Sequence, residues 1–307
     1  ENKTLLMIII TLYALFMIFF RFIDTVFQVE QNAVKFAVLQ TVQSVAALGL
    51  GLLLIIEFSY GWKGKYYAEL LVLFFIFVYA VYYIIKHGYY KYNTDYTKLK
   101  ELIFFLFPLT FSVLGLFIMG TIDRIFISNM LGLEAAGIYS VAITMAVIIN
   151  MVYDSVMKAL DPVIYQNLVI KENASKIKVV KLIYLYSFVC IVIYAAFLLL
   201  LPYVFNIMIN EKFIEALVLI PILGLGLTFE GLRKVLEAPL IFKHKVKSLA
   251  AITLIASFVN IVLNYYLIHI YGIHGAAYAT VISFLLLYIM TFSLLIKETS
   301  LPWKLKI

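Results

Sequence analysis

The sequence predicts an all-α integral membrane protein with about nine transmembrane helices. Composition is the first observation behind this fold class. Of the 307 residues, 65% are hydrophobic and only 13% are charged, whereas a soluble domain is roughly half apolar and a quarter charged. The second observation is that the apolar residues form continuous runs of about 20 residues, the length that crosses a bilayer as a helix. Because these runs are not alternating, helices are favoured over the strands of a membrane barrel.

Nine such runs follow one another along the chain, separated by short polar segments. No polar segment is long enough to form a separate soluble domain. The predicted spans are Thr4–Phe22, Phe36–Ile56, Ala68–Ile85, Leu102–Ile127, Ala136–Met157, Leu182–Val204, Phe213–Leu232, Leu249–Ile268 and Ala276–Ile296.

The basic residues are distributed unequally between the two sides of these spans. All but five of the 24 Lys and Arg residues fall on the side that also holds the C-terminal tail. The positive-inside rule makes that side cytoplasmic. The net charge of +7 then reflects orientation and contact with anionic headgroups, so membrane lipids are expected partners and nucleic acid is not. The exceptions are Lys3, Lys63, Lys65, Lys212 and Arg124.

An internal repeat relates the first three spans to the last three. The segment Tyr60–Gly64 matches Tyr271–Gly275, and Arg21 and Arg233 lie at a similar offset, each at the inner end of a predicted span. Both triplets have the same orientation, as in transporters built from two similar halves. The repeat predicts three further helices in a stretch of about 111 residues ahead of Glu1. Residues 1–100 would then hold the last three helices of an N-terminal half and a cytoplasmic loop, and residues 101–307 a six-helix C-terminal half.

A motif in the fourth and fifth spans carries a family resemblance. Asp123-Arg124 is followed by the segment Gly137–Ser140 (Gly-Ile-Tyr-Ser) and later by Pro162. This pattern resembles the polysaccharide flippases of the multidrug/oligosaccharidyl-lipid/polysaccharide exporter superfamily, in which it joins the seventh and eighth helices. The resemblance covers the chain as helices four to twelve of a two-halved, twelve-helix transporter.

The resemblance implies a function. Such flippases move undecaprenyl-diphosphate-linked oligosaccharides from the inner to the outer leaflet of the bacterial inner membrane by alternating access, for surface polysaccharides such as lipopolysaccharide. They are not bond-forming enzymes and need no cofactor. The lipid-linked oligosaccharide would be the ligand and polysaccharide polymerases the protein partners, and we expect a monomer.

Two other function classes stay open. A multidrug or peptidoglycan-precursor exporter of the same superfamily would have the same fold. A membrane glycan polymerase or ligase usually displays a large outer loop with its catalytic residues, and the loops predicted here are short. No nucleophile–base pattern is recognisable, and no two histidines have metal-ligand spacing on one helix face, so no catalytic or metal site is predicted.

Ionisable residues within spans are costly unless they pair or face a water-filled cavity, which makes them candidate site residues. For the diphosphate we expect cations. Arg124 is a candidate for binding the diphosphate or the glycan, with Asp123 orienting it, or both residues could pair with a neighbouring helix. Arg233 and Arg21 are candidates for receiving the diphosphate, or anchors at the inner interface.

Two carboxylates are candidates for ion coupling. Glu230 could carry a proton or sodium ion, or pair with Lys234 four residues later. Asp154 is a further candidate, and it could instead pair with Lys158, which is itself a candidate for binding substrate.

Overall fold

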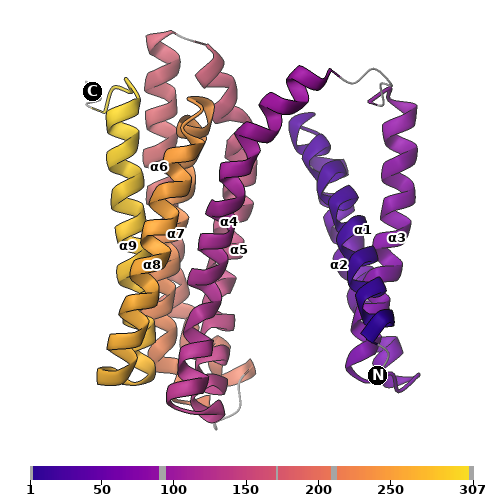
Figure 1. The fold of residues 1–307 in the computed structure, drawn as a ribbon, viewed down its shortest axis with the longest axis vertical. Coiled ribbons are helices and arrows are strands. Elements are labelled where there is room, and N and C mark those ends of the chain that lie inside the picture. The colour runs from indigo at the N-terminus through magenta and orange to yellow at the C-terminus, as the bar shows by residue number, and fades with distance from the viewer. Residues whose placement is uncertain (1–2, 90–94, 171, 209–212, 304–307) are drawn as a thin grey trace. The chain divides into compact units, whose positions relative to one another are not determined.

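The computed structural model describes residues 3–89, 95–170, 172–208 and 213–303, and within these ranges every regular element is a helix (Figure 1). Nine of the described helices are long and apolar enough to cross a membrane. The protein is therefore a multi-pass integral membrane protein, as predicted. The helices are α1 (Lys3–Val29), α2 (Ala33–Ile56), α3 (Trp62–Lys86), α4 (Tyr96–Met130), α5 (Leu133–Val169), α6 (Asn173–Met208), α7 (Ala216–Phe242), α8 (Val246–Tyr271) and α9 (Ile273–Glu298).

Contacts divide the chain into two compact units, Glu1–Asp95 and Tyr96–Ile307. In the first unit, α3 packs against both α1 and α2. Its core consists mainly of aromatic and aliphatic side chains from α1 and α3, such as Phe20, Ile23 and Leu73.

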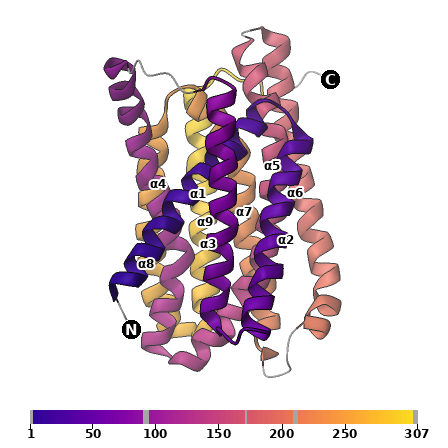
Figure 2. The same ribbon diagram turned by 90° about the vertical axis from the view of Figure 1, so that its right-hand side faces the viewer.

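The second unit is a six-helix bundle in which α7 is the most buried helix. Helix α7 packs along α5 on one side and α9 on the other, and α8 packs against both α4 and α9. Figures 1 and 2 show these helices running side by side. A central helix surrounded by others can hold polar side chains away from lipid, and α7 carries the principal charged cluster described below.

The outer surfaces of the helices are strongly apolar. Large side chains such as Ile18 and Leu48 are 67% exposed, and Leu199 is 75% exposed. In water such a surface would be unfavourable over its whole extent. Lipid chains solvate it instead, which explains why so many apolar residues face outward.

The helices are longer than the predicted spans because hydropathy detects only the apolar part of a helix. Helix α5 has 37 residues, about 55 Å at 1.5 Å per residue, against a hydrocarbon core of about 30 Å. The seventh predicted span ends at Leu232, whereas α7 continues to Phe242. Its charged residues pair with one another, so the helix does not have to end at the first of them.

The repeat recurs in the backbone geometry. Gly61 precedes α3 with φ 57° and ψ −144°, and Gly272 precedes α9 with φ 60° and ψ −139°. Both glycines have the positive φ that disfavours other residues. The packing of α3 on α1 and α2 also corresponds to that of α9 on α7 and α8.

Candidate functional site

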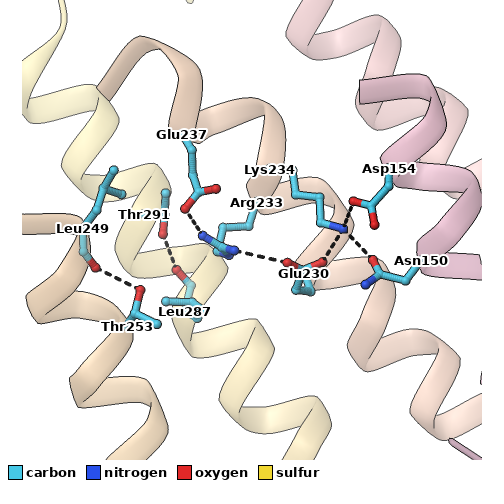
Figure 3. A network of polar contacts seen from close by, with 10 residues as sticks. All are labelled: Asn150, Asp154, Glu230, Arg233, Lys234, Glu237, Leu249, Thr253, Leu287 and Thr291. Atoms are coloured by element: carbon cyan, nitrogen blue, oxygen red, sulfur yellow. Dashed lines mark hydrogen bonds and ion pairs between the residues drawn. The ribbon is translucent and has the colours of Figure 1, made fainter. Parts of the chain in front are cut away.

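Helix α7 carries a charged cluster along one stretch of its length. Glu230, Arg233, Lys234 and Glu237 follow one another at spacings of three and four residues, so their side chains lie close together on the helix. The Arg233 guanidinium, 2% exposed, donates to Glu230 Oε1 at 3.2 Å and pairs with Glu237 on its other side. Figure 3 shows Arg233 between these two carboxylates.

Lys234 points the other way and connects α7 to α5 (Figure 3). Its Nζ donates to Asn150 Oδ1 at 2.7 Å and to Asp154 Oδ1 at 2.5 Å. It also lies 3.0 Å from Glu230 Oε2. A charged group inside a membrane helix costs several kcal/mol unless it is paired in this way.

These side chains line a cavity of about 360 Å³ between α5, α7 and one turn of α4. Three basic and four acidic residues line it. One donor in this cavity lacks an acceptor, because Arg233 Nε is buried without a hydrogen-bond partner among the described residues. The lining residues are Leu116, Asp154, Met157, Lys158, Asp161, Tyr165, Glu230, Arg233, Lys234, Glu237, Ala238 and Ile241.

A second polar site lies around Asp123, which is 3% exposed. The hydroxyls of Tyr139 and Thr280 donate to Asp123 Oδ2 at 2.6 and 2.8 Å. Asn264 Nδ2 donates to Oδ1 at 2.7 Å and to both the backbone and side-chain oxygens of Asn260. Four helices, α4, α5, α8 and α9, therefore meet at one buried carboxylate.

Asp123 differs from the carboxylates of the cavity in its partners. In the part of the chain that the structure describes, neutral groups make all its hydrogen bonds, and no Lys or Arg forms an ion pair with it. Asn264 Oδ1 and Asn260 Nδ2 have no hydrogen-bond partner among the described residues. Since the two atoms of an amide exchange places on rotation, Asn264 can offer its oxygen beside the carboxylate. Oxygen atoms of this kind are ligands for hard cations.

Residues 1–168 match the sequence profile of the family described as polysaccharide biosynthesis protein. The chain belongs to this family. The match includes α5 with Asn150 and Asp154, and it ends before α7. No curated protein matches the chain.

Comparison with solved structures shows that this chain has the fold of MATE transporters. A mutant MATE transporter of Vibrio cholerae is 15% identical, with a TM-score of 0.71 over 91% of this chain and 65% of that chain. An outward-facing multidrug resistance MATE transporter of the MOP superfamily is 16% identical, with a TM-score of 0.65 over 90% of this chain and 66% of that chain. The chain thus spans just under two thirds of these structures, and three helices ahead of Glu1 stay a prediction.

The structure brings four of the predicted site residues into the cavity: Arg233, Glu230, Asp154 and Lys158. The alternative of an interface anchor is wrong for Arg233, because this side chain is buried between two carboxylates. The alternative in which Glu230 pairs with Lys234 is confirmed. Asp154 also pairs with Lys234, on another helix.

Three predicted residues lie elsewhere. Arg124 is exposed next to the buried Asp123, as expected for neighbours about 100° apart on a helix. The alternative in which Asp123 contacts neighbouring helices is confirmed. Arg21 is exposed on α1 of the first unit, so it is not buried as its repeat counterpart Arg233 is.

Sequence reasoning missed several residues of both sites. Asn260 and Asn264 are four positions apart in an otherwise apolar span, and this spacing was a usable signal. Glu237 also had a signal, since it lies four positions after Arg233 on the same helix. Asn150 had none, because only the packing of α7 on α5 brings it to Lys234.

Proposed function

We propose that this protein is a flippase that moves undecaprenyl-diphosphate-linked oligosaccharide from the inner to the outer leaflet of the bacterial inner membrane for surface polysaccharide synthesis. The single observation that carries the proposal is the presence of three basic residues in the α5–α7 cavity. Arg233, Lys234 and Lys158 line it within a membrane bundle. Membership of the family described as polysaccharide biosynthesis protein supports a substrate of polysaccharide synthesis.

A lipid diphosphate is the part of this substrate that most needs such a cavity. Its oxygens accept charge-assisted hydrogen bonds, and guanidinium and ammonium groups are their strongest donors in proteins. Arg233 has an unused buried Nε–H. The polyprenyl tail can stay in lipid, which solvates the apolar outer surface of the helices.

A second candidate function is export of cationic drugs by the same fold. The observation that favours it is the excess of acidic groups, since Asp154, Asp161, Glu230 and Glu237 outnumber the three basic residues of the cavity. A cationic ligand would pair with these carboxylates and leave the lysines as counter-ions. Transport measurements with each ligand class separate the two functions.

The test uses the full-length protein in a bacterial strain that lacks its own copy of the gene. Lys158→Gln removes a cavity charge, and Lys181→Gln is the matched control on the exposed surface of α6. Arg124→Ala tests whether Arg124, which lies outside the cavity, takes part in binding the substrate as the sequence predicts. We expect Lys158→Gln to lower surface polysaccharide and to let the lipid-linked intermediate accumulate at an unchanged protein level, with little effect of Lys181→Gln.

Normal surface polysaccharide in both Lys158→Gln and Lys234→Gln would remove the cavity from the mechanism. Resistance to cationic dyes that depends on the protein, without any change in polysaccharide, would favour the second function.

For ion coupling we propose Asp123 in place of Glu230 and Asp154. Both of those carboxylates have basic partners, whereas Asp123 has neutral ones and neighbouring oxygen ligands. A proton or a sodium-sized cation could therefore bind there and change the contacts among four helices. In proteoliposomes, Asp123→Asn should abolish the response of transport to a cation gradient, while Glu230→Gln keeps it. The opposite pattern would return the role to Glu230.

A further inference from the structure

We infer that Asp154 is a built-in competitor of the substrate: it forms an ion pair with Lys234, and the diphosphate displaces it. This inference rests on the proposed function and concerns how the same cavity is controlled. It assigns to Asp154 neither ion coupling nor direct binding of substrate, but control of the availability of a lysine.

The first step concerns the donors of Lys234. An ammonium group has three N–H donors. Three oxygens surround this one, Asn150 Oδ1 at 2.7 Å, Asp154 Oδ1 at 2.5 Å and Glu230 Oε2 at 3.0 Å. The first two accept hydrogen bonds, whereas Glu230 Oε2 is an ion-pair partner without one. Because the three oxygens crowd the ammonium group, a phosphate oxygen can approach it closely only if one of them leaves.

The second step concerns which acceptor leaves. The Glu230 side chain is 9% exposed and is also held by Arg233. The Asp154 side chain is 51% exposed and belongs to α5 rather than to α7. On release, Asp154 is half exposed and has no second ion pair in the described part of the chain to keep it in place, whereas a released Glu230 would stay buried and lose an ion pair, which is much more costly. Asp154 is thus the acceptor that leaves with the least cost.

The third step concerns why a diphosphate would win. Carboxylate and phosphate oxygens both accept charge-assisted hydrogen bonds from ammonium groups. A diphosphate carries more negative charge than one carboxylate, and the cavity that holds Lys234 is also lined by Arg233 and Lys158. Displacement also breaks the Lys234–Asp154 contact, which joins α7 to α5. Binding of substrate would therefore remove one of the two contacts of Lys234 with α5 and leave its hydrogen bond to Asn150.

Asp161 provides a matched control for charge alone. It lines the same cavity as Asp154, and the structure gives it no contact with Lys234. Asp154→Asn and Asp161→Asn each change the charge of the cavity by one, but only the first removes the competitor. A purely electrostatic effect would be similar in the two variants.

The experiment measures the dissociation constant of farnesyl diphosphate, used as a short diphosphate lipid, for the full-length protein in lipid nanodiscs. We expect Asp154→Asn to bind about tenfold more tightly than the unmodified protein, and Asp161→Asn about twofold more tightly. In a Lys234→Gln background, Asp154→Asn should bring no gain, because there is no lysine to release. Thermal melting of each variant checks that it is folded.

Equal gains in the two Asp→Asn variants, or no gain in Asp154→Asn, would overturn the competition while leaving the diphosphate site intact. A gain that persists in the Lys234→Gln background would also overturn it. If neither the unmodified protein nor Asp154→Asn binds the probe, the proposed diphosphate site itself fails and the competition with it.

Discussion

Replacing Gly231 by alanine should destabilise the second unit, although alanine is the better helix former. A Cβ atom at Gly231 would lie 2.5 Å from Cδ2 of Tyr153 and 3.0 Å from two further ring atoms. The ring cannot easily move, since it is fully buried and its hydroxyl contacts Cys190 O and Thr228 Oγ1. Overpacking of this kind costs about 1–3 kcal/mol, against a helix-propensity gain of up to about 1 kcal/mol.

Gly137→Ala is the matched control, because a Cβ atom there would meet nothing within 4 Å. Both changes add a methyl group to a helix, so the difference between the two variants isolates the overpacking cost. Thermal stability of the detergent-solubilised protein, followed by size-exclusion chromatography after heating, measures it. We expect Gly231→Ala to melt at a lower temperature than the unmodified protein, and Gly137→Ala at the same or a higher one. Equal melting of both variants would refute the packing of α5 against α7 described here.

Three further predictions follow from other contacts. Tyr139→Phe removes a 2.6 Å donor to the buried Asp123 carboxylate and should cost about 1–3 kcal/mol of stability, measured by thermal melting. Gly275→Ala would place Cβ 1.9 Å from a backbone oxygen of α8, so we expect little folded protein in detergent extracts. Hydrogen bonds from Tyr89 and Tyr83 lower the pKa of Glu30 below its ordinary value of 4.5. The stabilisation from this shift is present above pH 4.5 and is lost as the pH falls through the lowered pKa. Tyr89→Phe should therefore reduce the acid sensitivity of melting, and an unchanged pH profile would contradict this.

The charged cluster on α7 also has consequences for how the protein is studied. Arg233 is buried between two carboxylates, and removal of one partner from a buried ion pair costs about 3–5 kcal/mol. A loss of transport in an Arg233 variant therefore does not separate binding from folding. Lys158 and Asp154 are better probes of function, because Asp154 is half exposed and Lys158 lies at the lining of the cavity.

The amino-acid sequence by itself determined the membrane class, the number of apolar helices and the repeat. Each of these is a local property of the chain. Lipid selects for the length and apolar composition of each helix. A positive φ selects for glycine at Gly61 and Gly272. The sequence also marked Asp123 and Glu230 as unusual, since ionisable residues within apolar spans are rare.

Only the tertiary structure decided what these residues contact. Spacing along α7 predicts that Glu230 can reach Lys234, but not that Asp154 of α5 reaches the same ammonium group. Nor does spacing predict that Asp123 is surrounded by hydroxyl and amide groups from three other helices. The physical reason is that a charge in lipid has to be paired but its partner can come from any neighbouring helix. The identity of the neighbour is set by how the six helices pack.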